Sequence, residues 1–78
     1  MPAYPEIARR AGVQGEVVLM AVIDQQGAIQ ELQVKSGHPM LVTAATNAVR
    51  QWKYRPFRLN GAAIEVETQI TVRFAMNR

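Results

Sequence analysis

The sequence contains no cysteine and a single histidine, His38, so it offers neither a disulfide framework nor the ligands of a structural zinc site. Its longest uncharged apolar run, Val17 to Ile23, is far shorter than the ~20 residues that cross a bilayer. No basic segment followed by an apolar stretch opens the chain, as it would in a signal peptide. We therefore expect no metal, no cofactor and no membrane span here. The chain is either cytosolic or a domain whose targeting segment lies upstream.

Catalytic patterns are also missing. Ser36 is the only serine, and although His38 is close in sequence, no third group is placed to orient its imidazole. Gly12, Gly15 and Gly27 do not form a phosphate-binding loop, because no Gly-Lys-Ser/Thr follows them. The sequence therefore predicts a protein that is not an enzyme.

Charge is modest and slightly basic. A net charge of +3 on 78 residues is a weak signal for nucleic-acid binding. Cations do alternate with aromatic residues between positions 50 and 58, as they do on some single-strand-binding surfaces. We assign Trp52 and Tyr54 to the core and expect Phe57 to point inward, which leaves no stacking platform. We expect no nucleic-acid partner.

What the chain does have is apolar residues, 49% of the total, in patterns of regular period. At this length it forms one domain, residues 1–78. A short helix is predicted from Tyr4 to Gly12, with Pro5 in its first turn and Gly12 able to end it in a left-handed conformation. So short a helix must dock, and Ile7 and Ala11 are the expected contacts.

Two strands follow. From Gly15 to Asp24 both faces are largely apolar, which is typical of a central strand or of a subunit interface. A turn ending at Gly27 leads to a weaker strand, Ala28 to Lys35. Ile29 and Leu32 fall on opposite faces of a regular strand, so a bulge near Gln30 and Glu31 is predicted.

The second half of the chain is more clearly patterned. A helix from Met40 to Trp52 carries a single apolar stripe that continues to Trp52. Pro56 prevents its continuation, and a short strand is expected from Tyr54 to Leu59. Asn60 and Gly61 form a hairpin signal, and Ile64 to Met76 alternates strictly as a strand with one core face and one wet face.

The order of these elements restricts the topology. The first two strands form a hairpin, and the second helix returns the chain across the sheet. In an all-antiparallel sheet the last strand then pairs with the first. We therefore predict an α+β fold: a three-stranded antiparallel sheet of order 2-1-3 with two helices on one face.

This topology leaves the longest strand, Ile64 to Met76, at an edge. Long unpaired edges are templates for another chain, and proteins usually protect them. Two interpretations stay open. Either the segment Tyr54 to Leu59, a neighbouring subunit or a terminal segment covers the edge, or the edge remains free to receive a peptide strand.

The order of motifs resembles that of the TonB C-terminal domain family over nearly the whole chain. The similar residues are Tyr4-Pro5, Gly12-x-x-Gly15-x-Val17, Val34-Lys35-Ser36-Gly37, Ala48-Val49-x-x-Trp52-x-Tyr54-x-Pro56, Asn60-Gly61 and Val72-Arg73-Phe74. Each piece is weak alone, but their order and spacing are specific.

The resemblance implies a periplasmic domain of an energy transducer without an active site. In that family an inner-membrane anchor and a Pro-rich spacer, absent from this chain, precede the domain, and a proton-driven motor of the ExbB and ExbD type supplies energy. The domain grips a short extended segment, the TonB box, of an outer-membrane receptor by β-augmentation, and siderophores, cobalamin or other nutrients then enter.

The resemblance also implies which residues bind the partner. Tyr4 and Pro5 match the family's pair at the entry to the first helix, near the bound segment, whereas Arg9 and Arg10 are expected to be solvated. The docking edge would be the last strand, acting mainly through main-chain groups: Val66, Glu67, Thr68, Gln69, Ile70, Thr71, Val72 and Arg73.

Alternatives remain at this point. The same module could be a periplasmic sensor or interaction domain of a membrane signalling protein or peptidase, or a TolA-like domain of envelope maintenance. Domains with an exposed sheet edge also exchange strands between copies, and the apolar outer face of Val18, Met20 and Val22 suits such contact. We expect a homodimer, with strand exchange as one route to it.

Overall fold

A computed structural model describes residues 3–76 of the chain. Within these residues there are two helices and five strands. Their order and bounds are α1 (Glu6–Arg10), β1 (Gly15–Ile23), β2 (Ile29–Ser36), α2 (Pro39–Gln51), β3 (Phe57–Leu59), β4 (Ala62–Ile64) and β5 (Val66–Phe74).

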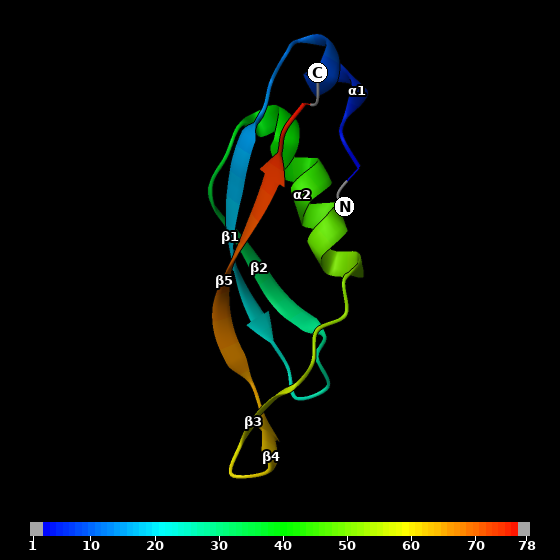
Figure 1. The fold of residues 1–78 in the computed structure, drawn as a ribbon. Coiled ribbons are helices and arrows are strands. Elements are labelled where there is room, and N and C mark those ends of the chain that lie inside the picture. The colour runs from blue at the N-terminus through cyan, green and yellow to red at the C-terminus, as the bar shows by residue number, and fades with distance from the viewer. Residues whose placement is uncertain (1–2, 77–78) are drawn as a thin grey trace.

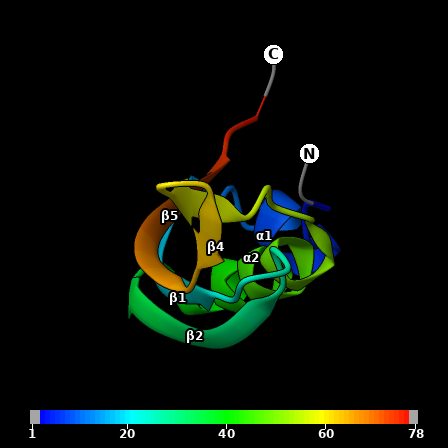
Figure 2. The same cartoon turned by 90° about the horizontal axis from the view of Figure 1, so that it is seen from below.

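The three long strands form one antiparallel sheet in the order β2-β1-β5. The sheet is strongly twisted, and Figure 2 shows that it curls around α2, with α1 on the same side. Figure 1 shows the length of the molecule, with α1 near one end and the β3–β4 hairpin at the other. The predicted α+β fold with sheet order 2-1-3 and two helices on one face is therefore confirmed.

The core lies between this face of the sheet and α2. Alternate residues of β1 are fully buried, because successive side chains of a strand point to opposite faces. Three residues of α2, spaced four apart, pack against them as the apolar stripe predicts. The buried apolar side chains are Ala8, Val17, Leu19, Ala21, Ile23, Leu41, Ala45, Val49, Val72 and Phe74.

Helix α1 ends where the sequence predicts it, at Gly12, whose φ of +72° is left-handed. The Gly12 N–H donates to the Arg9 carbonyl, and the Val13 N–H donates to the Ala8 carbonyl at 2.8 Å, the paired bonds of a Schellman motif. The predicted docking residues were wrong, since Ile7 is 64% exposed and Ala11 is also exposed. Ala8 is the buried residue instead, because a helix of one turn and a half presents only one small face to the core.

Strand β2 contains the predicted bulge and a second one. In its pairing with β1 the register passes from Glu31 to Ile29, so Gln30 is the extra residue. The register also passes from Ser36 to Val34, which leaves Lys35 as the extra residue of the second bulge. The pairing of β1 with β5 has no such break from one end to the other.

Helix α2 begins with His38, whose Nδ1 accepts a hydrogen bond from the Met40 N–H at 3.1 Å, and with Pro39 in its first turn. It ends one residue earlier than predicted, because Trp52 is extended with ψ of 140°. Trp52 therefore leaves the apolar stripe, and it is 36% exposed rather than part of the core.

The Asn60-Gly61 hairpin is confirmed, with both residues at positive φ as a two-residue turn requires. Its strands β3 and β4 form a separate two-stranded sheet, and the predicted long strand divides at Glu65 into β4 and β5. The inward placement of Phe57 was wrong: it is 54% exposed, because β3 does not join the main sheet.

The β1–β2 turn is locked against the segment that follows α2. Asp24 Oδ1 accepts hydrogen bonds from the Gln26 and Ala28 N–H groups at 2.8 and 2.9 Å, and the Tyr54 N–H donates to the Gly27 carbonyl at 3.3 Å. Gly27 is buried at φ +84°, and a Cβ there would lie 1.9 Å from the Tyr54 carbonyl oxygen. Only glycine permits this approach.

Candidate partner-binding surface

One edge of β5 carries the predicted docking residues. Among the described residues β5 pairs with β1 alone, and β1 occupies one edge of it from Val66 to Phe74. The segment from Tyr54 to Leu59 does not cover the other edge, since β3 pairs with β4. A strand of nine residues thus presents main-chain N–H and C=O groups without a strand partner.

The side chains of β5 alternate as the sequence predicts. Val66, Thr68, Ile70 and Val72 are half-buried or buried, on the side of the core, and the intervening residues are exposed. Val72 is the most deeply buried of the four. A partner strand at this edge would therefore meet mainly backbone, with the exposed side chains of Glu67, Gln69, Thr71 and Arg73 beside it.

The opposite edge of the sheet, on β2, is a poorer template. Bulges at Gln30 and Lys35 interrupt its register with β1 within six residues of each other, and bulges twist and bend a strand locally. Proteins use such bulges to protect sheet edges. β5 is therefore the longer regular edge of the two.

Tyr4 lies at the carboxyl end of β5. Its ring packs edge-on against Phe74, with the ring centroids 5.4 Å apart, and its hydroxyl donates a hydrogen bond to the Val13 carbonyl. The Arg9 guanidinium lies 5.9 Å from the centre of the Tyr4 ring, within cation–π range. Pro5 follows as the residue before α1, and its carbonyl accepts from the Arg9 N–H at 3.0 Å. Of the predicted residues, Tyr4 thus lies at the Phe74 end of β5, and Val66 lies at the other end of the strand.

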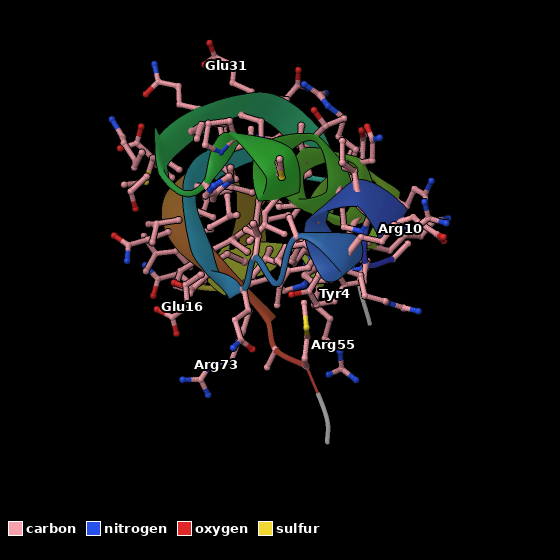
Figure 3. The ribbon with its side chains drawn as sticks, turned by 90° about the horizontal axis from the view of Figure 1, so that it is seen from above. Tyr4, Arg10, Glu16, Glu31, Arg55 and Arg73 are labelled. Carbon is pink, nitrogen blue, oxygen red and sulfur yellow. The ribbon has the colours of Figure 1, made fainter. Side chains whose placement is uncertain are left out.

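Polar contacts secure this same end of β5. The Met76 N–H donates to Gln14 Oε1 at 3.1 Å, and Arg73 Nε lies 3.6 Å from Glu16 Oε2 on β1. Figure 3 shows Glu16 and Arg73 reaching outward on one side of the molecule, with Tyr4 under α1. Because the Arg73–Glu16 pair is exposed, it contributes little to stability.

An open groove of about 740 Å³ lies between the amino-terminal segment and α2. Its walls are mostly apolar, and Ile7, Met40 and Trp52 are the large exposed side chains in it. Tyr4 and Pro5 form part of the same wall, so the groove begins beside the predicted docking residues. Sequence reasoning missed this groove because it assigned Ile7 and Trp52 to the core.

Within residues 3–76 no group of three or more His, Asp or Glu residues is placed to hold a metal ion. No helix among these residues is long and apolar enough to span a membrane. Hydrogen bonds from backbone N–H groups, that of Ala28 first, lower the pKa of Asp24, and burial raises the pKa of Tyr54; neither residue belongs to the β5 edge.

The Tyr54 hydroxyl is buried and has no hydrogen-bond partner among the described residues. The assignment of Tyr54 to the core was wrong: its side chain is half-buried and is not among the buried core residues. Phe57 and Leu59 on β3 are the other large apolar side chains that the sequence reading did not place at the surface. Their strict alternation with Arg58 is typical of a two-faced strand and was the available signal.

Taken together, these observations define a small α+β domain in which β5 has one edge without a strand partner among residues 3–76. The family described as Gram-negative bacterial TonB protein C-terminal matches residues 1–76. The chain belongs to this family, whose members are energy-transducer domains and not enzymes.

Two relatives of the chain are themselves called Protein TonB. Protein TonB of Xanthomonas campestris pv. campestris is 38% identical over 78 residues, which is 97% of this chain and 35% of that protein. Protein TonB of Vibrio cholerae is 36% identical over 77 residues, covering 96% of this chain and 32% of that protein. The chain therefore spans about a third of the length of these relatives.

The solved structures agree on the fold. The solution NMR structure of the Pseudomonas aeruginosa TonB C-terminal domain superposes with a TM-score of 0.82, covering 100% of this chain and 81% of that one. The sequence identity of this pair is 24%, so the match is evidence for the fold alone.

Proposed function

We propose that this domain binds the TonB box of an outer-membrane, TonB-dependent receptor by adding it as a fourth strand at the β5 edge. The single observation that carries the proposal is the edge of β5 that has no strand partner among residues 3–76; this strand is nine residues long and pairs with β1 in unbroken register. Membership of the family supports the identity of the partner.

The proposed binding residues act in two groups. Val66, Glu67, Thr68, Gln69, Ile70, Thr71, Val72 and Arg73 supply main-chain donors and acceptors to the bound strand. Tyr4 and Pro5 would contact the bound segment near the carboxyl end of β5; the packing of the Tyr4 ring against Phe74 supports this for Tyr4. Since main-chain pairing depends little on side chains, we expect tolerance of different receptor sequences.

The wider role follows from the family. We propose that residues 1–78 are one periplasmic domain of a longer protein whose upstream part holds an inner-membrane anchor and a Pro-rich spacer. A motor of the ExbB and ExbD type would energise that protein, and the domain would pass the energy to receptors for siderophores, cobalamin or similar nutrients.

We also propose that the isolated domain forms a homodimer. The outer face of β1, with half-buried Val18, Met20 and Val22, has neither helix over it, and the β5 edge has no strand partner among residues 3–76. Both features favour self-association when no receptor segment is present.

The proposed docking is tested by an amide chemical-shift titration of the ¹⁵N-labelled domain with an extended peptide from a receptor amino terminus. The largest shifts are expected at 66–73, with smaller ones around Tyr4, and none along β2, the bulged edge that serves as the internal control. Shifts centred on β2, or absent shifts with the β5 amides freely exchanging, would refute the proposal.

Backbone pairing is tested with two versions of the peptide. One is N-methylated at its odd-numbered residues and the other at its even-numbered residues. In a strand pair only alternate residues direct their N–H groups toward the neighbouring strand. One peptide should therefore lose binding while the other retains it. Equal binding by both would show that side chains, and not the main chain, hold the partner.

A further inference from the structure

The β3–β4 hairpin has no part in the docking edge, yet its shape is distinctive. Its two short strands pair with each other and with no other described strand. Figure 1 shows the hairpin projecting from the end of the molecule remote from α1. An isolated two-stranded hairpin is at best marginally stable in water. The exposed side chains of this hairpin therefore remain available for contact with another molecule.

One face of this hairpin is apolar. Phe57 pairs with Ile64 and Leu59 pairs with Ala62, and residues opposite each other in an antiparallel pair share a face. Phe57 is 54% exposed and Leu59 is 57% exposed. Arg58, paired with Ala63, lies on the other face, and its guanidinium donates to the Gly61 carbonyl at 3.2 Å, which holds it over the turn.

The surroundings of this face are basic. From residue 32 to residue 64 the sequence contains no Asp or Glu, and three cations, Lys53, Arg55 and Arg58, lie in or just before the hairpin. None of the three is in an ion pair within residues 3–76. Figure 3 shows Arg55 extended away from the body of the domain.

The nearest acids in the chain lie at the base of the hairpin. Glu65 follows β4 directly, and Asp24 uses its carboxylate within the β1–β2 turn, where it accepts from two N–H groups and from the Gln30 side chain. The segment from Lys53 to Glu65 thus carries three cations against one acid, and exposed apolar side chains lie on its hairpin.

We propose that the β3–β4 hairpin binds an anionic lipid surface, with Phe57 and Leu59 entering the headgroup region and Lys53, Arg55 and Arg58 contacting lipid phosphates. The apolar face is a protruding tip and not a groove, so it fits a deformable surface better than a shaped protein partner. An apolar face bordered by Lys and Arg is the pattern of elements that lie in the membrane interface. This inference does not depend on docking at β5.

The test is co-sedimentation of the 78-residue chain with vesicles of phosphatidylcholine alone, or of phosphatidylcholine with about a quarter phosphatidylglycerol. Binding is expected with the anionic vesicles only, and it should fall at about 0.5 M salt, where charges are strongly screened. Each cation at such a surface contributes about fivefold, so Arg55→Glu with Arg58→Glu should weaken binding by at least about 25-fold.

A matched control is Arg10→Glu with Lys35→Glu, which changes net charge equally but lies away from the hairpin; it should reduce binding by less than about threefold, because only long-range attraction changes. A second variant, Phe57→Ser with Leu59→Ser, keeps every charge and should also lose binding. Amide spectra verify that each variant is folded, which is expected because the hairpin lies outside the core. Addition of vesicles should broaden the amide signals of residues 57–62 first.

Several results would overturn the proposal. One is no binding to anionic vesicles at physiological salt, and another is an equal loss in the hairpin variant and the matched control. Binding of a soluble poly-glutamate peptide at the hairpin without vesicle binding would indicate an acidic protein partner instead. Hairpin signals that broaden with protein concentration but not with vesicles would indicate contact with a second copy.

Discussion

At the scale of single residues, Gly27 is the most constrained position of the fold. Its backbone is left-handed and its Cα faces the Tyr54 carbonyl, so the β1–β2 turn and the segment after α2 approach each other only because no side chain intervenes. Gly61 has nearly the same φ, +83°, but nothing lies within 4 Å of a Cβ built there. A substitution at Gly61 therefore reports backbone strain alone, whereas a substitution at Gly27 reports strain together with a steric clash.

We predict that Gly27→Ala destabilises the domain by about 3 kcal/mol or more, whereas Gly61→Ala costs about 1 kcal/mol, the strain of a left-handed alanine. Urea unfolding followed by circular dichroism measures both. Equal losses would mean that the Tyr54 carbonyl moves away easily and that the approach at Gly27 has no structural weight.

Asp24 makes the stability of the fold depend on pH in the acidic range. The Ala28 N–H, then the Gln26 N–H, stabilise the carboxylate and hold its pKa below the ordinary value of 3.8. A depressed folded-state pKa contributes stability that is present above the unfolded value and is lost as pH falls through the folded one.

We therefore predict that Asp24→Asn is less stable than the parent at neutral pH and that the difference shrinks as pH falls below 3.8. Urea unfolding midpoints across a pH series measure this difference. A gap that stays constant from neutral pH into acid would show that the turn hydrogen bonds do not distinguish the charged from the neutral carboxyl.

At the scale of elements, the start of α2 depends on an unusual cap. His38 is a less common N-cap than Ser, Thr, Asp or Asn, but its ring nitrogen satisfies the Met40 N–H. The helix does not extend upstream of His38, because Gly37 has φ of +143°, outside the helical region.

We predict that His38→Ala costs about 1 kcal/mol and that His38→Asn retains most of the stability, since asparagine accepts the same N–H. Thermal unfolding of the two variants checks this. If both variants lose the same amount, the side chain of His38 stabilises the fold by packing and not by capping.

The sequence predicted the features that depend on neighbouring residues better than those that depend on contacts between distant elements. The alternation of β5, the Asn60-Gly61 turn and the Gly12 helix stop are local patterns, and all three are confirmed. Ile7, Trp52 and Phe57 were placed wrongly because their exposure depends on where α1, the end of α2 and β3 lie relative to the sheet. No periodicity within those short segments reports that position.

The same limit applies to the candidate site. Edge position at β5 followed from element order alone, and the structure agrees. The contact of Tyr4 with Phe74, 70 residues away in sequence, and the groove beside it required the three-dimensional structure. Whether Val66 to Arg73 and Tyr4 contact a receptor stays a prediction.

At the scale of the whole molecule, the domain is elongated, with extents of 47 × 21 × 15 Å. One face of the three-stranded sheet has no helix over it, and the β5 edge has no strand partner among residues 3–76; both features favour self-association. The mass of the particle in solution is therefore a direct readout of how that edge is used.

We predict that light scattering at high protein concentration gives twice the chain mass of 8.7 kDa. An extended receptor peptide in excess should shift the population to a monomer, because the peptide and a second copy of the domain compete for the β5 edge. A mass of 8.7 kDa at every concentration would exclude the homodimer and leave the edge free in solution.

The contact between Tyr4 and Phe74 also determines how the domain responds to tension. A pull applied at the amino-terminal segment is divided at Tyr4, because the chain continues directly into α1 while the Tyr4 ring contacts Phe74 of β5 and its hydroxyl donates to the Val13 carbonyl. A ligand strand hydrogen-bonded along β5 would then feel that pull parallel to its own axis, with all its bonds sharing the load at once. The share of the pull that reaches β5 enters at the carboxyl end of this strand, beside the edge at which we propose that the partner strand binds.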